Sequence, residues 1–62
     1  MNEDLRQLLS DVTVRQMQIK SALEQFRRMQ VNTGRVYEKE INFLLDRLNA
    51  LNDYEKELNK LK

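Results

Sequence analysis

The sequence predicts an all-α protein built as a two-helix antiparallel hairpin, and three observations lead to this prediction. Leu, Ile, Val and Phe recur at spacings of three, four and seven residues, whereas a strand would place apolar residues at every second position. Good helix formers dominate the 62 residues, with no Pro and a single Gly. That glycine, Gly34, lies near the middle, so it divides one domain, residues 1–62, into two similar segments.

The first helix is expected over about residues 3–30. Glu3 and Asp4 fall in its first turn, where the helix dipole favours anions, and Asn2 is the expected N-cap. An apolar stripe at helical spacing predicts one core-facing side. The predicted core residues of this helix are Leu5, Leu9, Val12, Ile19, Leu23 and Phe26.

The predicted turn covers residues 31–34, which are four consecutive poor helix formers. Gly34 or Asn32 is expected to take the left-handed conformation that ends a helix, and Thr33 or Asn32 to cap the next one. The apolar stripe keeps its phase across this segment, however. An alternative therefore remains, in which the chain is one continuous helix in a coiled coil, about 90 Å long at ~1.5 Å per residue.

The second helix is expected over about residues 34–61, and it carries more apolar surface than one neighbouring helix covers. A stripe from Tyr37 to Leu58 is flanked by a second apolar row, and together they span roughly 200° of the helix. This surplus predicts that the helix packs on another copy of the chain or on another protein. The predicted interface residues are Val36, Phe43, Leu44, Leu48, Leu51, Tyr54 and Leu61.

Several uncharged residues outside the predicted core have two interpretations each. Gln16 and Gln30 interrupt the stripe of the first helix, where they either fix the register by bonding across the interface or lie at its rim in water. Amides that border the second stripe form interhelical hydrogen bonds or are solvated: Asn42, Asn49, Asn52 and Asn59. An uncharged strip on the far side of the first helix is a second interface or an ordinary solvated face: Ser10, Val14, Met17 and Ser21.

The charge balance argues against a dedicated nucleic-acid-binding protein. Eleven basic and ten acidic residues leave a net charge of +1, whereas such proteins carry a clear basic excess. The candidate basic contact residues are Arg15, Arg27, Arg28 and Arg35. A dimerising helical hairpin is similar in architecture, without a match in sequence, to plasmid RNA-binding bundles of the Rop type, so RNA binding is kept as a third hypothesis.

The residue types predict no enzyme, no metal site and no cofactor. The chain has no His and no Cys, and a single Gly cannot form a phosphate-binding loop. We therefore expect no small-molecule substrate. No apolar run approaches the ~20 residues of a membrane span. The expected setting is cytoplasmic, without contact to a membrane.

The function predicted from these features is protein–protein interaction through amphipathic helix packing. The favoured partner is a second copy, with two hairpins forming a four-helix bundle. The alternative is a small helical regulator or inhibitor, for example a phage-type antagonist, that docks its second helix onto a larger protein.

Overall fold

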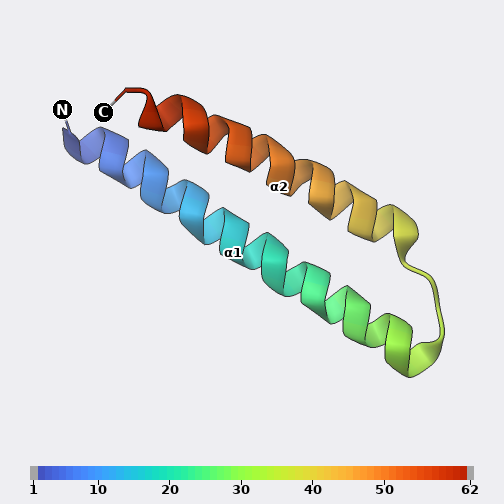
Figure 1. Cartoon of the computed structure of the whole chain (residues 1–62). Helices are drawn as coiled ribbons and strands as arrows, with labels where there is room; N and C mark the ends of the chain where they lie inside the picture. The colour runs from blue at the N-terminus through green and yellow to red at the C-terminus, as the bar shows by residue number, and fades with distance from the viewer. Residues whose placement is uncertain (1, 62) are drawn as a thin grey trace.

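The computed structural model describes residues 2–61 and contains two helices that pack against each other. α1 spans Asn2–Thr33 and α2 spans Glu38–Asn59. The helices run antiparallel, so both ends of the described chain lie at the same end of the molecule (Figure 1). Residues 2–61 contain no strand. The all-α hairpin is therefore confirmed, and the alternative of one continuous helix is wrong.

The connection lies further along the chain than predicted, at residues 34–37 instead of 31–34. α1 continues beyond residue 30 because Thr33 is accommodated inside the helix, where its Oγ1 donates to the carbonyl of Met29 at 2.7 Å. The second helix is correspondingly shorter than the predicted 34–61. The predicted N-cap side chain, that of Asn2, lies outside the described part of the structure.

Gly34 ends α1. Its φ of 73° is in the left-handed region, and its N–H donates to the carbonyl of Gln30 at 2.9 Å. This bond satisfies one of the free carbonyls at the helix C-terminus. Thr33 Oγ1 also accepts a hydrogen bond from the N–H of Arg35 at 3.2 Å, which stabilises the chain directly after the glycine. Of the two residues considered for this conformation, the structure selects Gly34.

Tyr37 begins α2 and also attaches the connection to α1. It occupies the N-cap position without a side-chain capping bond, so the predicted caps Thr33 and Asn32 are wrong. The N–H of Tyr37 instead donates to Oε1 of Gln30 at 3.0 Å, and its ring packs on Phe26 with 5.3 Å between the ring centroids. The start of α2 is therefore determined by contacts with α1.

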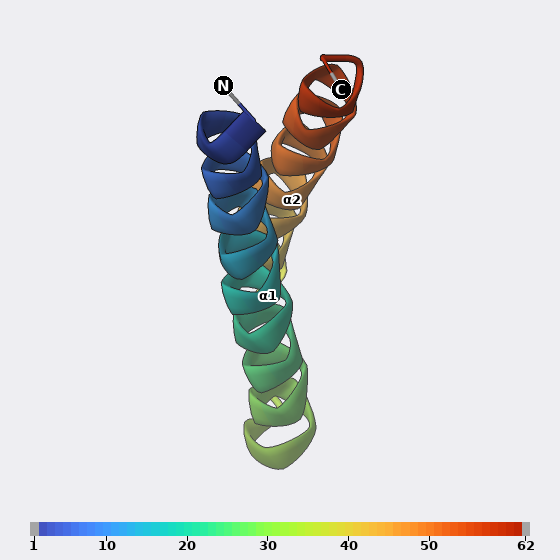
Figure 2. The same ribbon diagram turned by 90° about the vertical axis from the view of Figure 1, so that its left-hand side faces the viewer.

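The core between the helices is small. Only Val12, Leu23 and Leu58 are buried among the described residues. The remaining predicted core residues of α1 are half-buried, as are these residues facing them: Tyr37, Ile41, Leu44, Leu48 and Leu51. The hairpin measures 49 × 15 × 10 Å, and Figure 2 shows its two helices without any third element over them. Each helix thus has a single neighbour.

Replacing Gly34 with L-alanine is expected to lower the free energy of unfolding by about 1 kcal/mol, because a Cβ is strained at positive φ. An added Cβ would have no atom within 4 Å, so crowding does not contribute. Chemically synthesised chains with L- or D-alanine at this position provide the test, by urea unfolding at one fixed chain concentration. D-alanine accepts positive φ and should retain the stability. Equal losses from both would contradict the left-handed turn.

Candidate interaction surface

One side of α2 carries a row of residues that α1 does not cover. Phe43, Arg47, Ala50 and Tyr54 follow one another at spacings of four, three and four residues, so they share one side of the helix. We call these four residues the Phe43 row. The side chains of Phe43 and Tyr54 are 59% and 46% exposed. Two large aromatic rings therefore face solvent from the same side of the hairpin.

Two shallow hollows place residues of α1 beside this row. Phe43 and Leu44 line one hollow together with Ala22 and Phe26 of α1. Tyr54 and Leu51 line the other, together with Leu8 and Val12 of α1. Both helices thus contribute to one apolar side. We call it the apolar face, and its residues are Leu8, Val12, Ala22, Phe26, Phe43, Leu44, Leu51 and Tyr54.

Arg47 places a positive charge in the middle of the apolar face without removing its apolar character. Its guanidinium carbon lies over the Phe43 ring, 5.7 Å from the centroid. At this distance the electron-rich ring face attracts the cation. The aliphatic stem of an arginine held in this way lies along the surface and adds apolar area.

The opposite side of the hairpin carries more polar residues, although Leu45 is 36% exposed there, and a hydrogen bond between amides crosses it. Gln16 Nε2 of α1 donates to Asn52 Oδ1 of α2 at 2.9 Å. Asn49 lies three residues before Asn52, on the same side of α2. We call this side the polar face. Gln16 thus makes an interhelical bond and also lies at the solvated rim, so the structure combines its two interpretations. Gln30 is half-buried and accepts a hydrogen bond from the N–H of Tyr37 at the connection.

The predicted interface residues separate into three groups. Leu44, Leu48 and Leu51 are half-buried toward α1 and help to form the hairpin itself. Val36 and Leu61 are 77% and 72% exposed, but they lie in the connection and beyond the end of α2 instead of on the helix. Phe43 and Tyr54 are the members that project from α2 into solvent.

Leu8 belongs to the apolar face although it was not among the predicted interface residues. Its side chain is large, apolar and exposed. The sequence carries a signal for this, because Leu8 lies at the edge of the α1 stripe, on the side toward which Ala22 and Met29 also turn. Whether Leu8 is exposed or covered can be predicted only when the side of α1 on which α2 lies is known.

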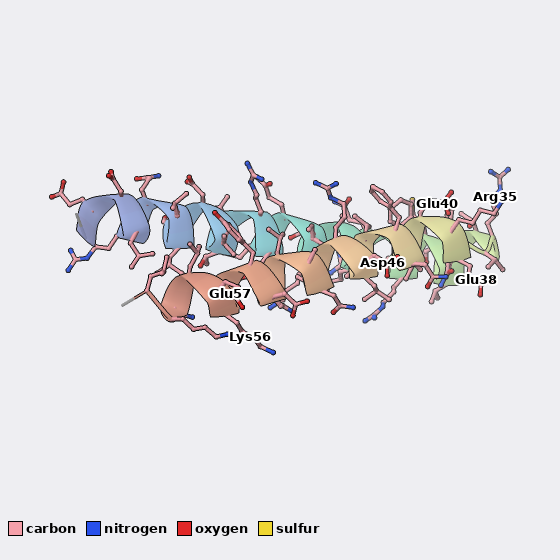
Figure 3. All side chains as sticks on the ribbon, turned by 90° about the horizontal axis from the view of Figure 1, so that it is seen from above. Arg35, Glu38, Glu40, Asp46, Lys56 and Glu57 are labelled. Carbon is pink, nitrogen blue, oxygen red and sulfur yellow. The ribbon has the colours of Figure 1, made fainter. Side chains whose placement is uncertain are left out.

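The candidate basic residues do not form one surface. Arg28 makes an ion pair with Glu24 at 2.8 Å, and both side chains are solvated. Arg15 lines the Tyr54 hollow beside Asp11. Arg35 extends from the connection, at the far end of the molecule from the termini (Figure 3). Arg27 and Arg28 line one shallow hollow near the end of α1, together with Glu24. Arg15 is separate from this pair.

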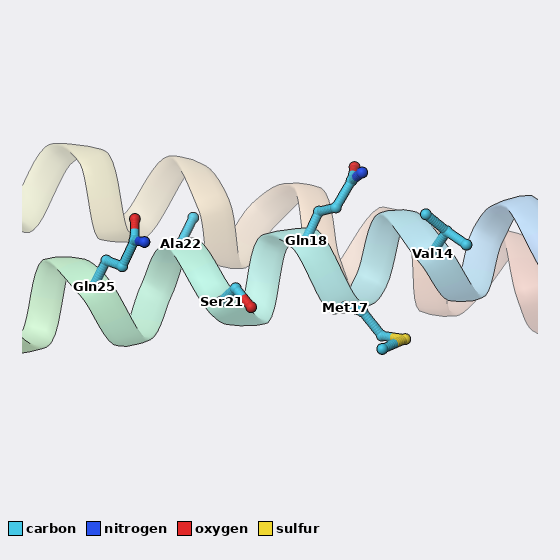
Figure 4. A pocket seen from close by; sticks show the side chains of 6 residues that line it. All are labelled: Val14, Met17, Gln18, Ser21, Ala22 and Gln25. Carbon is cyan, nitrogen blue, oxygen red and sulfur yellow. The ribbon is translucent and has the colours of Figure 1, made fainter.

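A further shallow depression lies on α1 alone. It is lined by Val14, Met17, Gln18, Ser21, Ala22 and Gln25, whose side chains project in several directions from one helix (Figure 4). This surface includes Val14, Met17 and Ser21 of the uncharged strip. No residue of α2 lines this depression. It is therefore part of the convex surface of a single helix.

Within residues 2–61 there is no group of acidic side chains arranged to hold a metal ion. No helix in the described part of the chain is long and apolar enough to cross a membrane. No protein-family model matches this chain, and no curated protein or solved structure shows significant similarity to it.

Replacing Gln16 and Asn52 with alanine, singly and together, should give a coupling energy of about 0.5 kcal/mol. This value is at the low end for a neutral hydrogen bond because the pair is solvated. The measurement is a double-mutant cycle of urea unfolding. The matched control is the cycle of Gln16 with Asn49, two residues that do not bond to each other in the structure. In this cycle the losses of stability from the two single changes should add. Equal coupling in both cycles would contradict the register.

Proposed function

We propose that this chain is a non-catalytic protein–protein interaction module that packs its apolar face on another protein. The favoured arrangement is a homodimer in which two hairpins form a four-helix bundle. The observation that carries the proposal is the exposure of Phe43 and Tyr54 above hollows to which both helices contribute. Exposed apolar residues that gather on one side of a protein and are rimmed by charged residues, here Asp11, Arg15, Lys39 and Glu40, are typical of protein–protein interaction sites.

The total accessible surface supports this proposal quantitatively. The chain exposes 5279 Å². A compact monomer of its mass, 7.5 kDa, is expected to expose only about 4,250 Å². The excess is roughly 1,000 Å², and each partner in a standard protein–protein interface buries about 800 Å². Covering one face of the hairpin would therefore bring its exposed area into the usual range.

In the alternative, a small regulator that docks on a larger protein, the chain would use the same face. The first experiment therefore asks whether this face contacts any protein, whichever the partner is. A photo-reactive phenylalanine analogue at position 43 should cross-link in cells that make the protein. The same analogue at Asn49, on the polar face, is the control and should give little product. An adduct of two chain masses identifies self-association, and another mass identifies a heterologous partner. Absence of any adduct from position 43 would overturn the proposed function.

Phe43→Glu is expected to weaken the assembly by about 2 kcal/mol or more, since it places a charge where an aromatic anchor packs. The helix content should stay the same because Phe43 lies outside the seam between α1 and α2. Light scattering measures the mass and circular dichroism measures helix content. Asn49→Glu introduces the same charge on the polar face and should leave the mass unchanged. A Phe43→Glu chain with unchanged mass and helicity would refute this use of the apolar face.

A further inference from the structure

The Phe43 row has the same spacing in both directions along α2, with an aromatic residue at each end. Phe43 and Tyr54 lie at equal distances on either side of the midpoint between Leu48 and Asn49, and so do Arg47 and Ala50. The two most exposed apolar residues next to α2, Val36 and Leu61, are centred on the same point. Two-fold pairing around this midpoint would bring Phe43 of each chain opposite Tyr54 of the other, because residue i then contacts j and j contacts i.

We infer that the occupant of the apolar face is a second copy of this chain, with α2 lying antiparallel on α2 of the partner around that midpoint. The inference rests on the proposed function and specifies its partner and register. In this arrangement Phe43 of each chain lies opposite Tyr54 of the other, which forms two aromatic pairs. Arg47 lies opposite the small side chain of Ala50, which leaves room for the arginine above Phe43.

Charge at the edge of the row favours the antiparallel direction. Lys39 and Glu57 are eighteen residues apart, which is five full turns, so they project from the same side of α2. Antiparallel pairing around the midpoint places Lys39 of one chain within about one residue, ~1.5 Å along the axis, of Glu57 of the other. The two-fold axis repeats this contact. Parallel pairing would not bring Lys39 to Glu57, because it turns this edge of each helix to opposite sides of the pair.

Glu57 is accessible for such a contact. Its carboxylate pairs with Nζ of Lys60 at 3.2 Å, and both side chains are largely exposed. An exposed pair of this kind contributes little to stability, so exchanging or sharing its partner is easy. Lys39 lines the Phe43 hollow from the rim. Figure 3 shows Glu57 toward the terminal end of α2 and Glu40, the residue after Lys39, near the connection. The two proposed ion pairs therefore lie at opposite ends of α2.

The test uses thiols, because the natural chain has no cysteine. Lys39→Cys chains are mixed with Glu57→Cys chains under mild oxidation, and the products are identified by mass. Antiparallel pairing predicts that the mixed disulfide predominates, since two thiols at position 39 would be about 28 Å apart along the axis. Lys39→Cys mixed with Lys56→Cys is the control, because position 56 turns about 100° away from position 57. Predominant like-with-like disulfides, or a statistical mixture, would overturn the register.

A charge exchange tests the same contact without covalent bonds. Lys39→Glu should raise the dimer dissociation constant several-fold, and adding Glu57→Lys should restore it to within about twofold, as compensating charges across an interface do. Sedimentation equilibrium provides the constants, and circular dichroism verifies folding. Failure of the second change to restore association would contradict the pairing of Lys39 with Glu57.

Failure of this inference is distinguishable from failure of the proposed function. If the chain stays monomeric at ~1 mM, self-association is too weak to matter and the second copy is wrong. If the photo-reactive group at position 43 nevertheless joins a different protein, the proposed function stands. If it joins nothing and the chain is monomeric, both are overturned.

Discussion

In a two-helix hairpin each helix has one neighbour, and that neighbour covers only part of its circumference. α1 and α2 bury three residues between them and leave the rest of the seam half-exposed. A domain of this size also buries a smaller fraction of its surface than a larger domain does. Several large apolar residues outside the seam stay exposed as a result, and among them Leu8, Phe43 and Tyr54 share one side of the hairpin. The form of the apolar face follows from this geometry.

The two faces of the hairpin differ because the bonds that hold it together are not symmetric about the seam. Near the connection, Gln30 and Phe26 hold Tyr37. Further along, Gln16 and Asn52 join the helices on the polar face. Neither set covers the side where Phe43 and Tyr54 project. The register of the seam, to which these contacts contribute, determines which residues of α1 lie beside the Phe43 row.

Helical periodicity predicts the hairpin, its core side and the excess apolar width of α2, because these depend only on spacing. The position of the connection depends on tertiary contacts. Thr33 stays in α1 because its hydroxyl donates to the carbonyl of Met29. α2 begins only after Tyr37, whose N–H donates to the side chain of Gln30. Propensity alone cannot supply either contact, so the predicted turn is about three residues early. Leu8 was missed for a similar reason, since the side on which it is exposed depends on where α2 lies.

The asymmetry between the faces also limits what an assembly of this chain would be. A hairpin with apolar surface on both sides would stack indefinitely, because each added copy would present a fresh face. Here one side carries the Phe43 row and the other carries a solvated amide pair. A two-fold pairing through the first side uses up the apolar face of both chains and leaves polar faces outward. The proposed self-association would use the same face in both copies, so a single heterologous partner could cap that face in place of the second copy.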